Sequence, residues 1–294
     1  MNTLITSIDT SAQPQPVRRQ HRVGFWMGRV LLGILALIIG LAAIGASYQA
    51  IATANDRRHF PAPGQLVDVG GYKLHINCMG QGSPTVILES GLANPSSIWG
   101  WVQPEVAHAT RVCAYDRAGV GWSDPGPEPR DGQQIARELH TLLGKANVPE
   151  PYVLVGHSTG GLYVRVYAAQ YPRDVVGMVL VDVEHPDQWT QSPAAQAQFQ
   201  TYARLGRVQQ VLARLGVIRA FNLNPVSRDL PPAQAAAYKA FMDTTQFADV
   251  NAAELAAHAA TDTQVRSAGP LEALPLIVLT APGGHGFPRR RQRR

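Results

Sequence analysis

The stretch that decides the fold is YVLVGHSTGG, which runs from Tyr152 to Gly161. Its first four residues are apolar and mostly β-forming, so they predict a buried strand. A Gly-x-Ser-x-Gly sequence follows with Ser158 at its centre, and the next residues, LYVRVYAAQY, are typical of a helix. Such a turn lifts the serine hydroxyl above a sheet and points the unpaired N–H groups of the helix N-terminus at any anion beside it. We expect Gly156 and Gly160 to be required because strand and helix close on each other there.

The pattern is that of a nucleophile elbow, but it has a simpler interpretation as well. Gly-rich turns between a strand and a helix are common, and a serine in one can merely cap the helix. The neighbouring elements therefore have to decide between the two interpretations.

The composition is that of a neutral globular chain with a basic end. The 294 residues are 45% hydrophobic and carry a formal net charge of +5, but five arginines lie within the last six positions. Without them, basic and acidic groups balance at 21 each. The charge therefore gives no indication of nucleic-acid binding, and the length suits one α/β domain with an insertion.

The N-terminal part predicts a membrane anchor. Residues 1–29 are expected to form a disordered cytoplasmic segment, and the uncharged, Leu/Ile/Ala-rich residues 30–52 a transmembrane helix. More arginines precede the helix than follow it, which predicts a single-pass protein of a bacterial-type inner membrane with its main domain on the periplasmic side. A cleaved signal peptide is the alternative, because residues 50–52 and 52–54 offer small-x-small sites. Both interpretations export the domain.

The rest of the chain alternates predicted strands and helices. Strands are expected at residues 85–90, 111–116, 152–155, 175–182 and 274–282, with a hairpin around residues 70–71 and helices at 96–107, capped by Ser96 or Ser97, and at 132–147. Continuous apolar strands between helices predict a mainly parallel sheet, whose ligands bind beyond the strand C-termini. Residues 183–270 are Ala- and Gln-rich and show only helical patterning. We therefore expect a core at 64–182, a helical lid at 183–270, a core strand at 271–282 and an Arg-rich tail at 283–294.

This order of elements resembles the α/β-hydrolase fold family, in its serine esterase-like form. The resemblance rests on ESGLANPSSIW, YDRAGVGWSD, GHSTGG, LVDVEHPDQ, the helical insertion and LPLIVLTAP, and covers about residues 64–282. It implies that Ser158 is the nucleophile and that the backbone N–H groups of Thr159 and of Leu92, or its neighbour Ala93, form an oxyanion hole. Each such donor is worth about 3–4 kcal/mol in comparable sites.

A serine nucleophile also needs a base and an acid that orients it. The family takes its acid from the loop after the seventh strand, but no Asp or Glu lies between residue 273 and the end. Asp182 follows the sixth predicted strand, where some members carry the acid, and Glu184 and Asp187 lie just beyond it. The alternative is that Asp182 caps the next turn.

The candidate base is His285, because it is the only histidine after the last predicted strand. His157 adjoins Ser158 but in such elbows points into the core, and His185 is a weaker alternative. After the last predicted strand we expect neither the eighth strand nor the closing helix of the family. We therefore expect a C-terminally shortened relative with an uncovered last strand, marginal stability and impaired hydrolysis.

The two cysteines are expected to form a disulfide. Cys78 ends the second predicted strand and Cys113 lies early in the fourth, and in this fold these strands are antiparallel neighbours. An exported domain favours the bridge. Two buried thiols are the alternative.

The leading hypothesis is a membrane-anchored serine hydrolase that acts on a small-molecule carboxylic ester. A serine at the elbow argues against epoxide hydrolase and haloalkane dehalogenase chemistry, which uses a carboxylate, and SGLAN in place of HGGPG disfavours a proline iminopeptidase-like activity. The non-enzymatic alternative is a degenerate hydrolase domain. The sequence shows no metal-ligand cluster, phosphate loop or cofactor motif, so the expected partners are the ester and the lipid bilayer.

Overall fold

A computed structural model describes residues 18–224, 229–271 and 274–280 of the chain. The expected base His285 and the expected tail lie outside these residues. The described elements are α1 (Arg18–His59), β1 (Gln65–Asp68), β2 (Lys73–Met79), β3 (Thr85–Glu89), η1 (Ser96–Trp99), α2 (Val102–Ala107), β4 (Val112–Tyr115), α3 (Gly132–Lys145), β5 (Tyr152–His157), α4 (Gly160–Gln170), β6 (Val175–Val181), α5 (Pro193–Arg214), α6 (Val217–Ala220), α7 (Pro232–Met242), α8 (Thr245–Ser267) and β7 (Leu276–Leu279). The chain divides into two compact units, residues 1–44 and 45–294.

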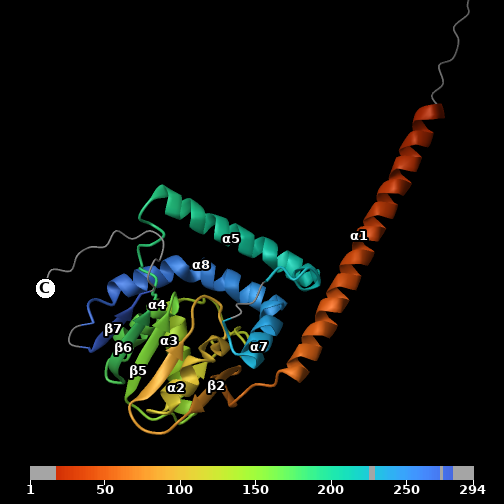
Figure 1. Ribbon diagram of the computed structural model, residues 1–294. Coiled ribbons are helices and arrows are strands. Elements are labelled where there is room, and N and C mark those ends of the chain that lie inside the picture. The colour runs from red at the N-terminus through yellow and green to blue at the C-terminus, as the bar shows by residue number, and fades with distance from the viewer. Residues whose placement is uncertain (1–17, 225–228, 272–273, 281–294) are drawn as a thin grey trace, which may run out of the picture. The chain divides into compact units, whose positions relative to one another are not determined.

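The second unit is built on one sheet of seven strands in the order β1-β2-β4-β3-β5-β6-β7 (Figure 1). Strand β2 pairs antiparallel with β1 and β4, and the other pairs are parallel. The expected mainly parallel sheet is therefore confirmed. Its central strands are buried apolar runs, as parallel strands with both faces covered must be.

Helices cover both faces of this sheet. One core cluster joins the strands to α3 and α4, and a second, which includes Trp99, joins the strands to η1 and α2. The expected single helix over residues 96–107 is wrong in detail, because a 3₁₀ turn and a short α-helix replace it. Neither expected serine caps the turn through its side chain. Instead, the Ser96 N–H donates to Asp116 Oδ1 at 2.6 Å, so the end of β4 satisfies this backbone group.

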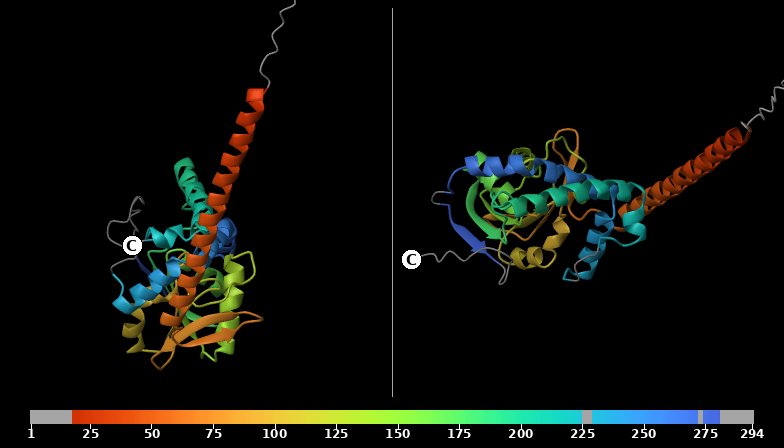
Figure 2. Two further views of the ribbon diagram at one scale, coloured as in Figure 1. Left: turned by 90° about the vertical axis from the view of Figure 1, so that its right-hand side faces the viewer. Right: turned by 90° about the horizontal axis from the view of Figure 1, so that it is seen from above.

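Between β6 and β7 the described chain forms four helices and no strand. Helix α8 packs on α3 and α4, and α5 lies side by side with α8 over the same end of the sheet (Figures 1 and 2). The expected helical insertion is thus present where the sequence patterning placed it.

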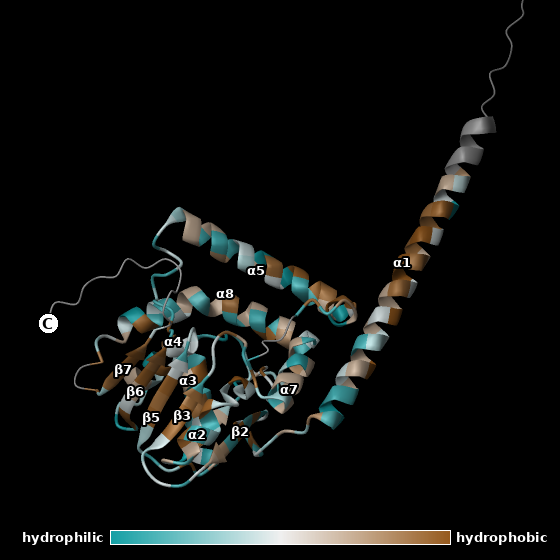
Figure 3. Cartoon of the chain, viewed as in Figure 1, coloured by the Kyte–Doolittle hydropathy of each residue, from teal (hydrophilic) through white to brown (hydrophobic). Residues whose placement is uncertain are grey.

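Helix α1 begins at Arg18, well before the expected start at residue 30. It is the one described helix that is long and apolar enough to cross a membrane, and its most apolar window has a mean hydropathy of 2.6 with no buried residue (Figure 3). The helix also continues past the expected end at residue 52 and ends at His59. Its residues 45–59 belong to the second unit and pack on it.

Strand β7 is the edge of the sheet within the described chain. It pairs with β6, and all four of its side chains are exposed. The expected uncovered strand is therefore seen among the described residues, as an apolar edge that another strand or chain can approach.

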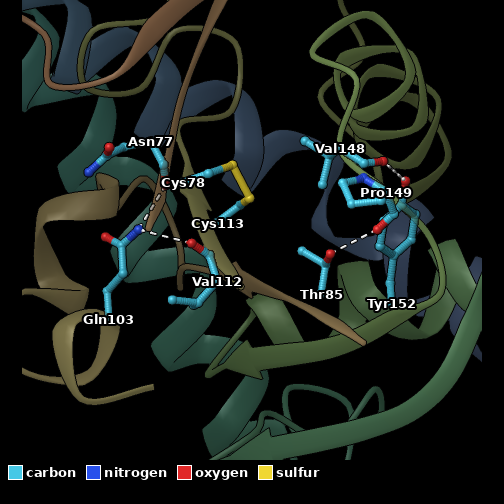
Figure 4. Close-up of a disulfide and its surroundings, with 9 residues drawn as sticks. All are labelled: Asn77, Cys78, Thr85, Gln103, Val112, Cys113, Val148, Pro149 and Tyr152. Atoms are coloured by element: carbon cyan, nitrogen blue, oxygen red, sulfur yellow. Dashed lines mark hydrogen bonds between the residues drawn. A yellow bond between two sulfur atoms is a disulfide. The ribbon is translucent and has the colours of Figure 1, made fainter. Parts of the chain in front are cut away.

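A disulfide joins β2 to β4. Cys78 and Cys113 are direct partners in the antiparallel register, with an S–S distance of 2.01 Å and a Cα–Cα distance of 4.0 Å (Figure 4). The Gln103 amide, which donates to Asn77 O at 2.7 Å, lies next to the bridge and ties α2 to the same strand.

Replacing both cysteines, Cys78→Ser with Cys113→Ser, should lower the free energy of unfolding by about 2–4 kcal/mol, because the bridge closes a loop of 35 residues. Urea denaturation measures the change. The native protein treated with a reductant should lose the same amount, and an unchanged midpoint in both samples would contradict a stabilising bridge.

Candidate active site

The elbow places Ser158 at the C-terminal edge of the sheet. Strand β5 ends at His157, α4 starts at Gly160, and Ser158 between them has a φ of +52°. This left-handed conformation is strained for a residue with a side chain and is typical of functional turns. The Ser158 N–H donates to Val181 O at 3.1 Å, so the turn is held against the end of β6.

The two outer glycines of the motif are required for different reasons. A Cβ on Gly156 would lie 2.6 Å from the Cα of Gly161, which is the expected clash of strand with helix. A Cβ on Gly160 would lie 2.5 Å from Ser90 O and 2.7 Å from Glu89 O. The expectation for Gly160 therefore needs correction in its partner, because the first turn of α4 meets β5 at Gly156 and meets the end of β3 at Gly160.

Two backbone N–H groups near Ser158 make no hydrogen bond among the described residues. Within the described part of the chain, neither Leu92 nor Thr159 donates its N–H to any group. The loop that carries Leu92 runs beside the serine, since a Cβ on Gly91 would lie 3.2 Å from the Ser158 Cβ. The N–H of Ala93, which the sequence left as an alternative, donates to Glu254 Oε2 at 2.7 Å and is not available.

A buried arginine holds this loop in place. Arg117 is 2% exposed and donates to Ser90 O and Gly91 O, both at 2.8 Å. The same guanidinium binds Glu254 on α8, with Nε 2.8 Å from Oε1, and also Glu89 at 2.5 Å. Arg117 directly follows the strand expected at residues 111–116, but nothing in the sequence pairs positions 117 and 254.

The expected acid lies at the neighbouring strand end. Asp182 follows β6 with an exposed side chain and a φ of +45°, and its N–H donates to Leu279 O at 2.7 Å. Ser158 and Asp182 thus occupy adjacent strand ends, next to the point where the chain leaves β7.

The two alternative histidines differ in their surroundings. His157 packs edge-on against buried Trp99 with ring centroids 6.3 Å apart, as expected for a core-facing ring, and burial lowers its pKa. His185 is exposed, and its Nδ1 accepts a hydrogen bond from the Asp187 N–H at 3.1 Å.

An unexpected buried cluster lies against the elbow. Glu184 accepts a hydrogen bond from the Thr159 hydroxyl at 2.7 Å and another from the Trp189 indole. Its carboxylate also lies 3.3 Å from His258 Nε2, while His258 Nδ1 lies 3.2 Å from Asp262. Both ring nitrogens of His258 are therefore engaged by carboxylates.

The charges of this cluster follow from its contacts. Burial by itself would lower the pKa of His258, but hydrogen bonds to Asp262 and Glu184 outweigh burial and raise the pKa to about 9. Burial raises the pKa of Glu184, yet His258 and the Thr159 hydroxyl hold it below its usual value. At neutral pH His258 is an imidazolium that links α8 to the elbow, and it has no free nitrogen with which to accept a proton from Ser158.

The sequence alone indicated one of the two contacts of His258, the one with Asp262. His258 and Asp262 are four residues apart, which puts them on one face of a helix, but such pairs are common on helices. Glu184 is 74 positions away from His258 and could not be paired with it from the sequence. Among the described residues, no group of three or more His, Cys, Asp or Glu side chains is placed to hold a metal ion.

Gly160→Ala should lower the free energy of unfolding by about 1–3 kcal/mol, because the new methyl group overpacks against two fixed carbonyl groups. Gly144→Ala is the matched control. Gly144 lies in helix α3, and a methyl group added there would have no neighbouring atom within 4 Å, so alanine should stabilise by up to about 1 kcal/mol. Denaturant unfolding of both variants measures the difference, and equal shifts would refute the close contact with β3.

His258→Gln should remove a pH-dependent part of the stability. Since the folded pKa lies above the usual value of 6.5, the stabilisation is fully present below pH 6.5 and is lost as the pH rises through 9. We expect a difference in unfolding free energy on the order of 3 kcal/mol at pH 6 that nearly vanishes by about pH 9.5. The exposed His140 supplies the control His140→Gln, and a pH-independent effect of His258→Gln would contradict the charged clamp.

Similar proteins share this architecture. The family described as the alpha/beta hydrolase fold matches residues 84–254, more than half of the chain. An uncharacterised Schizosaccharomyces pombe protein is 34% identical over 151 residues, which cover 41% of this chain and 28% of the relative. A Cronobacter turicensis protein named as a carbamate hydrolase is 33% identical over 102 residues, or 34% of this chain and 38% of that protein.

Among solved structures, the epoxide hydrolase CorEH aligns with a TM-score of 0.59 and 18% identity, over 73% of this chain and 80% of that one. At this identity the likeness shows the fold alone. The chain spans between 20% and 50% of the length of the first relatives that it matches by sequence. The matched segment contains the elbow, the loop that carries Leu92 and the strands that position them, and the chain belongs to the α/β-hydrolase-fold family.

Proposed function

We propose that this protein is a membrane-anchored serine hydrolase that cleaves a carboxylic ester. The observation that carries the proposal is Ser158 at a left-handed turn beside two undonated N–H groups, those of Leu92 and Thr159. In this mechanism the Ser158 hydroxyl attacks the acyl carbon and the two N–H groups stabilise the oxyanion that forms. The alcohol then leaves, and water releases the acid from the acyl-enzyme.

The proton from Ser158 needs an acceptor, and His285 is the proposed base with Asp182 as the acid that orients it. Asp182 supports this assignment by its position, because its N–H binds Leu279 O at the end of β7. His285 follows Leu279 by six positions in the sequence, a separation that an extended chain can span over at most roughly 20 Å.

A catalytically inactive hydrolase-fold protein is the competing hypothesis. One observation favours it: the described histidine nearest the elbow on the insertion, His258, is held by Glu184 and Asp262 and is not available as a base. A probe that reacts only with an activated serine separates the two hypotheses.

The anchor in this proposal is the part of α1 before the second unit. Residues 25–44 rise about 30 Å as a helix at 1.5 Å per residue, which matches the hydrocarbon thickness only when Arg29 lies at its edge. The proposed span is therefore shorter at its C-terminal end than the 30–52 expected from the sequence. The Cys78–Cys113 disulfide supports export of the domain, since such bonds persist in oxidising compartments.

Ser158→Ala should abolish fluorophosphonate labelling and lower the turnover of a short-chain p-nitrophenyl ester by about 10³-fold or more. Ser267→Ala, at an exposed end of α8, is the matched control and should behave as the native protein. Equal low background from native protein and Ser158→Ala would establish the inactive alternative.

A further inference from the structure

The helical insertion meets α1 where α1 enters the second unit. The turn after α5 lies directly on Gly45, where a Cβ would come within 2.2 Å of Leu215 O, and Gly216 would similarly meet Gly45 O at 2.7 Å. One turn later on α1, Gln49 is 4% exposed and donates to Asp243 O at 2.7 Å. The α5–α6 turn is thus docked on the first residues that follow the proposed membrane span.

The uncharged part of the proposed span is shorter than the hydrocarbon core of a bilayer. Arg29 interrupts residues 25–44, so the wholly uncharged run before Gly45 is residues 30–44. That run covers about 22 Å, against about 30 Å of hydrocarbon. A short span draws its flanking residues toward the bilayer, and the α5–α6 turn on Gly45 comes with them.

Helix α5 carries an apolar surface on the side away from the domain. Leu205, Val208 and Val211 recur every three residues and are 58%, 53% and 57% exposed. The opposite side of the helix packs on α8 through buried Gly206 and Ala213. Figure 3 shows the hydrophobic residues concentrated toward the C-terminal part of α5. After α6, Phe221 is also exposed, at 71%.

The charges on α5 are of one sign. The helix contains three arginines and no acidic residue. Arg214 pairs with Asp249 at 2.8 Å, whereas Arg204 and Arg207 are exposed and pair with no carboxylate of the described chain. An exposed helix face that combines aliphatic residues with arginines that have no carboxylate partner has the composition of a segment that lies in the interface of an anionic membrane.

We propose that the outer face of α5, defined as Arg204, Leu205, Arg207, Val208 and Val211, lies in the headgroup region of an anionic lipid bilayer. The apolar side chains enter the interface and the two arginines bind lipid phosphates. The insertion then contacts the membrane surface through α5, and a substrate that partitions into the bilayer can reach it without crossing water. This inference rests on the proposed anchor and not on catalysis by Ser158.

The test uses the full chain in vesicles of phosphatidylglycerol and phosphatidylcholine. Its two cysteines are bridged, so Val208→Cys supplies a unique site for an NBD fluorophore. Lys145→Cys, an exposed position at the end of α3, is the matched control. We expect the emission of the probe at 208 to shift to shorter wavelength and to be quenched by brominated lipid, while the probe at 145 changes in neither respect. Arg204→Gln with Arg207→Gln should lower the ratio of docked to undocked helix about fivefold per arginine.

Three outcomes would overturn the inference. If the two probes behave alike while the chain resists extraction by alkaline carbonate, α5 does not touch the bilayer although the anchor holds. Release of the chain by carbonate would contradict both the proposed anchor and the inference that rests on it. A Val208→Cys disulfide dimer that forms in place of lipid quenching would assign the surface to a second copy. The label on a Ser158→Ala background should report the same quenching, so loss of catalysis and loss of membrane contact are distinguishable.

Discussion

The contact between the first turn of α4 and the last carbonyl groups of β3 is the constraint from which the candidate site follows. Gly160 approaches Glu89 O and Ser90 O so closely that no side chain fits between them. The chain passes from β5 to this helix through a turn in which Ser158 has a positive φ. The same approach brings the loop after β3 beside the serine. The same close approach thus accompanies both the turn at Ser158 and the position of the proposed oxyanion donors.

Buried charge maintains that geometry from the other side. Arg117 binds the carbonyl groups of the loop after β3, and Glu254 binds both Arg117 and the Ala93 N–H. Removing one member of such a buried group typically costs 3–5 kcal/mol, because it leaves a charge without a partner. Since Glu254 belongs to α8, the helical insertion is part of the framework of the site rather than a detachable cover.

His258 illustrates why burial and proximity do not identify a base. Its ring lies near the elbow and is held by two carboxylates, as a catalytic histidine often is by one. A second carboxylate changes its role, because both nitrogens are occupied and the positive charge is stabilised at neutral pH. The ring therefore acts as a charged link between the insertion and Thr159, and the proton chemistry in the proposed mechanism falls to the segment after β7. The insertion consequently joins three features: the elbow through Glu184, the loop after β3 through Glu254, and α1 through the turn at Gly216.

The sequence by itself determined the local features: the strand-turn-helix at Ser158, the mainly parallel sheet, the helical insertion, the apolar N-terminal helix and the pairing of Cys78 with Cys113. These follow from periodicity, turn residues and strand order, which depend on residues close together in the chain or on the resemblance to a family. Only the tertiary structure showed that Gly160 packs against the end of β3 and that the Ala93 N–H donates to Glu254. It also showed that α1 contacts the domain from Gly45 onward. The reason is that these contacts join residues far apart in the chain. The sequence around a buried glycine, carboxylate or imidazole does not indicate which distant residue will pack against it.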